Sequence, residues 1–237
     1  MPGSDEGDGP APRTLREERT PSPMRRTIAE RLAESYREAV HVTASREVDA
    51  ETLAGTADRA GEGVAITDVV IRALSAALDA HPSFNATFED GRHRLYEEHN
   101  VGVAVAVDDG LVAPVLADVG SKSLAEVARE RRRLTDAVQA GEHSMADLRG
   151  GTITLSNLGP LGVDSFTPII NPPEVAILGL SRLRERARPD GGGGVTFRQE
   201  VRFDLSFDHR VVDGADAARF LGTLAERIEV ADRYLDG

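Results

Sequence analysis

The order of helical and strand patterns along this chain is the feature that most limits the fold it can adopt. Apolar residues recur at helical spacing in some stretches and alternate in others, but the two kinds do not follow one another in a regular βαβ repeat. We see no internal repeat of longer period. We therefore predict one α+β domain, in which helices cover a mixed sheet.

Four helices are predicted from apolar periodicity and from residues that begin helices. The first starts at Pro23 behind Ser22, and its apolar residues Ile28, Leu32 and Tyr36 lie on one face. The others are expected from Thr67 to about residue 80, from a Ser123–Glu126 capping box to about Ala140, and over residues 215–228. The arginine-rich run at residues 129–133 is expected to be a solvated face of the third helix.

Strands are predicted where apolar residues alternate between turn residues. One is a buried hairpin, in which residues 101–107 turn at residues 108–110 and return over residues 111–116. Other strands are expected at residues 41–48, 152–156, 175–181 and 196–207, with a hairpin tip at Gly191–Gly194. Residues 1–22 have no apolar period, so we expect a disordered tail or linker remnant there and the folded domain over residues 23–237.

Composition excludes several classes of protein. The 237 residues are 40% hydrophobic, which is enough for a buried core. No apolar run reaches the roughly 18 residues of a membrane span, and the N-terminus lacks the basic-then-apolar order of a signal peptide, so we expect a cytoplasmic protein without a membrane partner. The chain has no cysteine, which rules out thiolate nucleophiles. Any reacting thiol must therefore belong to a substrate.

The chain is strongly acidic. Its formal net charge is −12, from 40 acidic and 28 basic residues, so nucleic acid is not an expected partner. Lys122 is the only lysine, and arginine supplies nearly all the positive charge. This balance is typical of halophilic-like acidic proteins, in which salt screens the repulsion between carboxylates. It concerns the habitat of the protein rather than its chemistry.

Metal binding is not predicted. His41, His81, His93, His99 and His143 lack the i, i+4 spacing of metal ligands on a helix. The glycine run at the expected hairpin tip also lacks the strand-to-helix context of a phosphate-binding loop, so we interpret it as a turn.

The segment with the most informative polar groups is Phe207-Asp208-His209-Arg210-Val211-Val212-Asp213-Gly214, where an alternating strand gives way to a helix. Functional residues often lie at such junctions. His209 continues the phase of the apolar face of that strand, so we expect its imidazole to point toward the covered side of the sheet. The segment also allows a structural interpretation, with His209 in the core, Asp213 as the N-cap of the last helix and Arg210 as an ion-pair partner.

Several segments, in the same order along the chain, resemble one known family. They are the DHRxxDG pattern of Asp208–Gly214, the stretch from Gly151 through Ser156-Asn157-Leu158-Gly159 to Phe166–Gly179, the helix at Pro23–Leu32 and the hairpin segment Leu111–Val115. Together they resemble the catalytic domain of dihydrolipoyl acyltransferases, the E2 components of 2-oxo acid dehydrogenase complexes, over residues 22–230. By itself, the second stretch also fits a strand, a glycine-rich turn and a proline-stiffened loop.

The resemblance implies a chloramphenicol-acetyltransferase-like sandwich, assembled as trimers with active sites between subunits. It implies acyl transfer between a dihydrolipoyl thiol and the thiol of coenzyme A, with His209 as general base. It also implies that Ser156 of the adjacent subunit donates a hydrogen bond to the oxyanion and that Asp213 supports the site. Capping of the last helix stays an equal alternative for Asp213. Arg210 is left outside the catalytic set because a guanidinium stays protonated.

The same resemblance implies the partners. Coenzyme A is expected as a substrate, lipoate is expected on a lipoyl domain that is not in this chain, and the E1 and E3 components are the expected enzyme partners. A homotrimer is expected, but a larger core is left open because Val230–Gly237 lacks the apolar tail that family members commonly use to join trimers. The acyl group is not fixed. Two alternatives remain: a coenzyme A-dependent acetyltransferase acting on a small alcohol, and a non-catalytic trimeric scaffold.

Overall fold

The structure is a computed structural model that describes residues 13–61, 63–108 and 110–235. Its α-helices are α1 (Pro23–Glu38), α2 (Glu51–Arg59), α3 (Ile66–Leu78), α4 (Leu124–Gln139) and α5 (Gly214–Glu229). Its strands are β1 (His41–Asp49), β2 (Ala86–Glu89), β3 (Arg92–Leu95), β4 (Val101–Val103), β5 (Val105–Val107), β6 (Gly110–Val112), β7 (Val115–Leu116), β8 (Ile153–Asn157), β9 (Ala176–Leu180), β10 (Arg184–Pro189) and β11 (Val195–Asp208). Short 3₁₀ helices lie at Pro82–Phe84, Val119–Ser121, Gly159–Leu161 and Ala231–Leu235.

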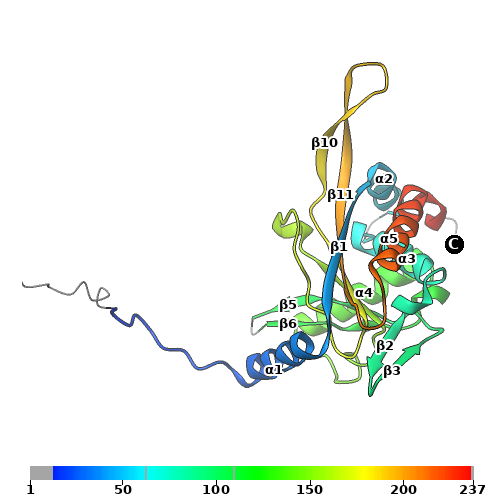
Figure 1. Cartoon of the computed structure of the whole chain (residues 1–237). Helices are drawn as coiled ribbons and strands as arrows, with labels where there is room; N and C mark the ends of the chain where they lie inside the picture. Colours follow the sequence, from blue (N-terminus) through cyan, green and yellow to red (C-terminus); the bar gives the residue numbers. More distant parts are fainter. Residues whose placement is uncertain (1–12, 62, 109, 236–237) are drawn as a thin grey trace, which may run out of the picture.

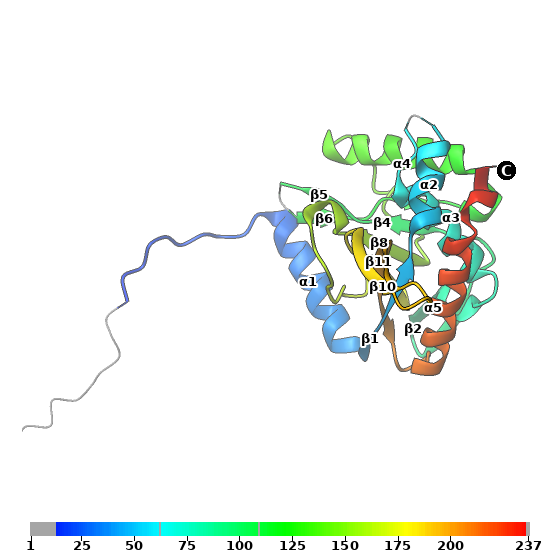
Figure 2. The same ribbon diagram turned by 90° about the horizontal axis from the view of Figure 1, so that it is seen from above.

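One mixed sheet organises the domain (Figure 1). Its strands lie in the order β1-β11-β9-β8-β4-β7, and β10 pairs with the outer part of β11. Strand β8 runs parallel to β4 and β9, whereas the other pairs in this sheet are antiparallel. Figure 2 shows α2, α3, α4 and α5 along one side of the sheet and α1 apart from them. The predicted α+β class is therefore confirmed.

The core lies between the sheet and α3 and α5. Helix α3 is apolar around most of its circumference, and its Val70, Ile71 and Leu74 are fully buried. Phe220 of α5 is also fully buried and stacks on Phe84, with 4.6 Å between the ring centroids. Burying one such large apolar side chain contributes about 1.5–3 kcal/mol. In the part of the chain that the structure describes, no helix is both long and apolar enough to span a membrane.

The predicted helices are confirmed, with two corrections in their details. Ser22 caps α1 by accepting a hydrogen bond from the Arg25 amide at 3.2 Å, and the capping box of α4 forms as predicted. Thr67 was predicted to cap the helix α3, but α3 begins one residue before it, at Ile66, and Ala65 occupies the N-cap position. The start of the helix is stabilised by the buried Asp68 carboxylate, which accepts a hydrogen bond from the Ala65 amide at 2.8 Å. The arginine run of α4 is not wholly solvated, since Arg131 forms an ion pair with Asp68.

The predicted hairpin over residues 101–116 forms but is divided between two sheets. Its base, β4 with β7, joins the main sheet, whereas β5 and β6 form a separate pair. Only the base is largely buried, and Leu111 near the tip is 47% exposed, so the expectation of a buried hairpin was wrong for its outer half. Helix α2 and the β2–β3 hairpin were not predicted.

Strand β10 and the outer part of β11 form an arm that projects from the body of the molecule (Figure 1). The predicted glycine tip joins the two strands. Phe197 and Val195, near the tip, are 66% and 65% exposed.

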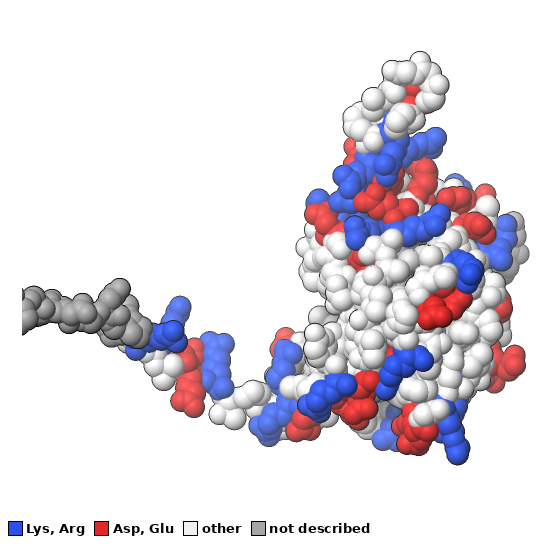
Figure 3. Space-filling model, in the orientation of Figure 1, with Lys and Arg blue, Asp and Glu red and all other residues white. Residues whose placement is uncertain are grey.

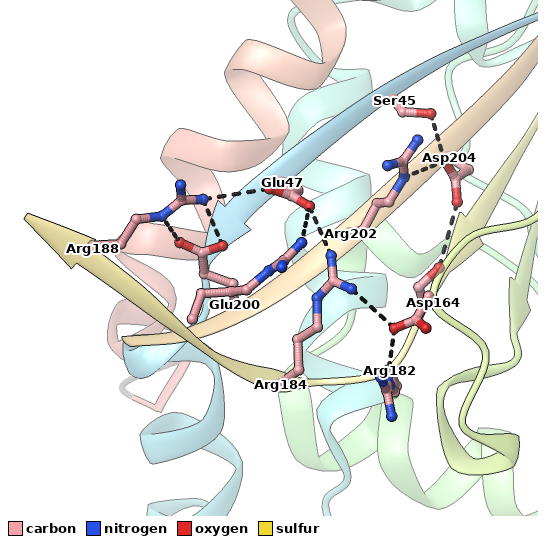
Figure 4. Close-up of polar contacts among 11 residues, drawn as sticks. Ser45, Glu47, Asp164, Arg182, Arg184, Arg188, Glu200, Arg202 and Asp204 are labelled. Carbon is pink, nitrogen blue, oxygen red and sulfur yellow. Dashed lines mark hydrogen bonds and ion pairs between the residues drawn. The ribbon is translucent and has the colours of Figure 1, made fainter. Parts of the chain in front are cut away.

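Arginines and carboxylates gather at the base of this arm (Figures 3 and 4). Arg188 contacts both oxygens of Glu200, at 2.5 and 2.8 Å, and Arg184 contacts Glu47 at 2.8 Å. Glu200 is only 8% exposed and Glu47 32%, so these pairs are partly buried and tie the arm to β1.

Candidate functional site

His209 lies in a turn that its neighbours hold in place. The buried Asp208 accepts hydrogen bonds from the backbone amides of Val40 at 3.2 Å and Arg210 at 3.1 Å. It also accepts the Arg210 guanidinium through both oxygens, and the guanidinium carbon lies 4.7 Å from the centroid of the Phe88 ring. Burial raises the pKa of Asp208, but the hydrogen bonds from Arg210 outweigh this effect and hold the pKa below its ordinary value. The prediction that Arg210 is an ion-pair partner is confirmed.

The His209 imidazole itself is open to solvent in the isolated chain. Its side chain is 40% exposed, and the residue lies one position beyond the end of β11. The ring lies 5.8 Å from that of the buried Phe207, so it keeps the predicted phase of that face, but it is only partly covered within one chain. The His209 backbone amide donates to the Val40 carbonyl at 2.9 Å, so the ring is exposed on a fixed backbone.

Asp213 occupies the N-cap position of α5 but does not cap it with its side chain. Its backbone is extended, with φ −95° and ψ 159°, and no side-chain cap hydrogen bond forms. The carboxylate is 78% exposed and lies 3.8 Å from Nδ1 of His209, just beyond hydrogen-bond distance. Asp213 is thus the carboxylate beside the imidazole, and side-chain capping does not account for it in this structure.

Ser156 lies near the end of β8, between β4 and β9 in the sheet. The residue is 7% exposed, and among the described residues its hydroxyl makes no hydrogen bond. The strand opposite it contributes Gly179, where a Cβ would lie only 2.9 Å from the ring of Phe166. The glycine therefore lets the loop that follows Ser156 close onto the sheet.

Within one chain the structure does not bring Ser156 and His209 together. Ser156 pairs across the sheet with Gly179, which pairs in turn with Asp204. His209 lies five residues beyond Asp204 along the direction of β11. Two strand spacings and five residues correspond to roughly 10 Å across the sheet and roughly 17 Å along it. Within one chain the two side chains are therefore too far apart to contact the same thioester group.

Glu174 is a buried carboxyl group beside this region that sequence reasoning did not single out. It is 5% exposed and accepts hydrogen bonds from Thr154 Oγ1 at 2.6 Å and Asn171 Nδ2 at 2.9 Å. Burial raises its pKa to about 7 despite these two donors. In the sequence, Glu174 stands out only as a member of the family-like stretch from Gly151 to Gly179. That membership does not show that its carboxyl group is buried.

Replacing Glu174 with glutamine is expected to change how stability depends on pH. The carboxyl ionises near 4.5 in the unfolded chain but near 7 in the folded one. Between these values the folded state binds more protons, so stability falls as pH rises, by roughly 3 kcal/mol in total. Glutamine can still accept from Asn171 and can donate to Thr154, without ionising.

Urea unfolding at pH 5 and pH 8 measures this effect. The Glu174→Gln variant should gain stability relative to the wild type at pH 8 but not at pH 5. Glu89→Gln, at a largely exposed carboxylate, is the matched control and should not change the difference between the two pH values. Parallel pH dependences for Glu174→Gln and the wild type would contradict the raised pKa.

A pocket of about 490 Å³ lies beside the His209 turn. Its lining includes Ser35, Ala39, Ile170, Asp208 and Arg210, but not His209 itself. Among the described residues, no three side chains of the kinds that ligate metals are gathered together.

Comparison with known proteins identifies the family. The family model described as 2-oxoacid dehydrogenases acyltransferase (catalytic domain) matches residues 15–235. The succinyltransferase component of the 2-oxoglutarate dehydrogenase complex from Bartonella vinsonii subsp. berkhoffii is 35% identical over 93% of this chain and 56% of its own length. The lipoamide acyltransferase component of the branched-chain alpha-keto acid dehydrogenase complex from Pseudomonas aeruginosa is 36% identical over 87% and 50%. The chain therefore belongs to the family of 2-oxo acid dehydrogenase acyltransferase catalytic domains.

A third relative has a different acyl group in its name. The dihydrolipoyllysine-residue acetyltransferase component of the pyruvate dehydrogenase complex from Haemophilus influenzae is 41% identical over 68% of this chain and 29% of its own length. The chain thus spans about half the length, or less, of these three relatives.

Solved structures agree with this assignment. Dihydrolipoamide acetyltransferase from Azotobacter vinelandii matches with a TM-score of 0.87 at 29% identity, covering 96% of this chain and 99% of that one. Its report concerns the roles of a serine, a histidine and an asparagine in the catalytic mechanism. The cubic core of a pyruvate dehydrogenase multienzyme complex matches with the same TM-score at 30% identity, with the same coverage. A chloramphenicol acetyltransferase, with a TM-score of 0.55 and 15% identity over 87% of this chain and 94% of that one, shows the shared fold, as predicted.

Proposed function

We propose that this domain transfers an acyl group between a dihydrolipoyl thiol and the thiol of coenzyme A, as the catalytic core of a 2-oxo acid dehydrogenase complex. The observation that carries the proposal is the exposed His209 imidazole on a rigidly held turn, in a chain of this acyltransferase family. A neutral imidazole can accept a thiol proton near neutrality.

The chemistry requires few groups from the protein. His209 takes the proton from the incoming thiol, and the resulting thiolate attacks the thioester carbonyl to form a tetrahedral oxyanion. The Ser156 hydroxyl donates a hydrogen bond to that oxyanion. When the carbon–sulfur bond to the leaving thiol breaks, the imidazolium returns its proton to the departing sulfur. Atoms and charge balance without a metal ion or a protein thiol.

The site is proposed to lie between subunits of a homotrimer. The separation of His209 and Ser156 along the sheet supports this arrangement. The surface between α1 and the base of the arm carries few charges in Figure 3. Exposed apolar side chains on α1, on β1, between these two elements and on the loop before β9 suit contact with another subunit; they are Leu32, Tyr36, Val40, Val42 and Ile169. Assembly of trimers into a larger core is left open.

Asp213 is proposed to orient polar groups beside His209. In the Azotobacter vinelandii protein the histidine and the asparagine named together lie four residues apart, the spacing that separates His209 from Asp213 here. The 3.8 Å between the Asp213 carboxylate and Nδ1 of His209 also supports this role, because a small rotation would bring the two groups within hydrogen-bond distance.

The wider assembly follows from the same proposal. A lipoyl domain outside this domain would carry the acyl group, which E1 would supply, and E3 would reoxidise the dihydrolipoyl group that remains after transfer. The three relatives are named as a succinyltransferase, an acetyltransferase and a branched-chain acyltransferase component, and their sequence identities to this chain are similar. Similarity of the whole chain therefore does not choose the acyl group. The division into a tail or linker remnant at residues 1–22, of which 1–12 lie outside the described residues, and an acyltransferase domain at 23–237 is also part of the proposal.

The test is acyl transfer from acetyl-, succinyl- and isobutyryl-coenzyme A to free dihydrolipoamide, at low salt and at molar salt. We expect turnover with at least one donor and the fastest rate with the physiological acyl group. The acidic composition makes molar salt the more favourable condition. Transfer only to a small alcohol would favour the chloramphenicol-type alternative. A folded trimer without turnover toward any acceptor would favour the scaffold.

A further inference from the structure

Two side chains from distant parts of the chain hold the backbone of Ile170. Ser35 Oγ, on α1, donates to the Ile170 carbonyl at 2.6 Å. The Ile170 amide donates to Nε2 of His41, at the start of β1, at 3.2 Å. Ile170 is 1% exposed and Ser35 is 3% exposed, so water cannot easily replace either contact. Both backbone polar groups of this buried residue therefore depend on Ser35 and His41.

The contacts of His41 fix one state of its ring. A backbone amide can only donate, so Nε2 must be the unprotonated, accepting nitrogen. Nδ1 then carries the proton and can donate to the Ala39 carbonyl, which lies 3.2 Å away. The ring also stacks on Tyr36, with 5.9 Å between centroids and 29° between the planes. One neutral tautomer satisfies all of these contacts at once.

The segment that carries His41 also anchors the His209 turn. Val40 accepts the His209 amide at 2.9 Å and donates its own amide to Asp208 at 3.2 Å. His41 is the strand partner of Asp208. Ser35, Ile170 and Asp208 border the same pocket of about 490 Å³. His41 thus joins the loop before β9 to the backbone that presents His209.

Other contacts hold the same loop near its two ends, and one of them is the bond from Arg31 of α1 to the Pro172 carbonyl at 2.9 Å. On one side, the Phe166 amide donates to Asp204 at 3.2 Å. On the other, Asn171 donates to the buried Glu174 at 2.9 Å. The side-chain contacts of Ser35 and His41 lie between these anchors and connect the loop to α1 and β1.

We propose that His41, together with Ser35, is a positioning residue that sets the distance between loop 166–171 and the His209 turn. This inference rests on the proposed acyltransferase function, for which the separation determines how a substrate fits beside His209. His41 touches no reacting atom in this account. A misplacement of about 1 Å in an active site can lower a rate by about a hundredfold, so a contact of this kind affects turnover.

The experiment compares His41→Ala and His41→Gln in the full chain. Hydrogen–deuterium exchange of a peptide spanning residues 166–171 reports on the loop, and steady-state kinetics report kcat and KM. We expect His41→Ala to raise the exchange of this peptide and to lower kcat about ten- to a hundredfold, with a smaller change in KM. His41→Gln should restore most of both, because its side-chain carbonyl can accept the Ile170 amide.

The matched control is His93→Ala. His93 lies on β3, and its imidazole lies 3.1 Å from the Ser83 carbonyl, a contact that alanine removes. This variant should change neither readout. Unchanged exchange and kcat in His41→Ala would overturn the proposal, as would equal losses in the alanine and glutamine variants together with equally lowered unfolding temperatures. If the wild type transfers no acyl group, the proposed function fails, and the exchange measurement still decides whether His41 holds the loop.

Discussion

Replacing His209 with alanine is expected to lower kcat for acyl transfer by about 10²–10⁴-fold, the usual contribution of a general base. The fold should survive, because the structural contact of His209 is its backbone amide to the Val40 carbonyl, which alanine retains. The imidazole is 40% exposed, and its nearest charged partner, Asp213, lies beyond hydrogen-bond distance. Loss of the ring therefore removes chemistry and little packing.

Steady-state rates with the fastest acyl donor measure this effect. Because the base acts in the transition state, kcat and kcat/KM should fall together. His93→Ala is again a useful control, since it also removes one imidazole but lies on β3, away from the turn. Full activity of a correctly assembled His209→Ala protein would remove His209 from the mechanism, and with it the reaction scheme proposed above.

Patterns of near neighbours in the sequence predicted much of this fold. The starts of α1 and α4 were correct because Ser22 and Ser123 cap helices through contacts within three residues. The end of β11 and the start of α5 were close to their predicted positions because alternation gives way to helical spacing at His209. Local contacts of this kind can be predicted from local sequence.

Interactions between distant segments could not be predicted in this way. Asp68 stabilises the start of α3 partly through Arg131, sixty-three residues later, so the sequence around Thr67 pointed to the wrong cap. The burial of Glu174 and the contact between His41 and Ile170 likewise depend on how the loop before β9 packs against α1 and β1. Neither residue belongs to a pattern whose spacing reveals its partner.

The candidate site shows the same limit. Motif resemblance selected His209, Ser156 and Asp213, and their catalytic roles remain predictions. The position of His209 after a strand and the phase of its ring were correct, whereas its partial exposure was not predicted, because cover depends on what packs over the end of the strand. The distance between Ser156 and His209 required the order of the strands, in which Gly179 pairs with Ser156 on one side and with Asp204 on the other, each more than twenty residues away in the sequence.

Replacing Ser156 with alanine is expected to lower kcat by about 10²–10³-fold, or about 3 kcal/mol in transition-state stabilisation. KM should change little, because the oxyanion exists only after attack on the carbonyl. Stability should also change little, since the Ser156 hydroxyl makes no hydrogen bond among the residues that the structure describes. Initial rates and thermal unfolding of the variant measure both expectations.

The position of Ser156 predicts a further result that a single variant cannot give. If each site takes His209 from one subunit and Ser156 from the next, a mixed assembly of His209→Ala and Ser156→Ala chains contains some sites with both native residues. Each trimer that contains both variants has one interface with native His209 on one side and native Ser156 on the other, so about a third of the sites in the mixed trimers should be intact. Differently tagged chains, co-expressed and purified through both tags, provide this assembly.

The control assembly combines two differently tagged His209→Ala chains, which should stay as inactive as that variant alone. Recovery of activity in the mixed assembly but not in the control would place the two side chains in sites shared between subunits. If His209 and Ser156 served one site within a single chain, mixing would create no intact site and activity would stay at the level of the variants. The roughly 17 Å that separates them along the sheet favours the first result.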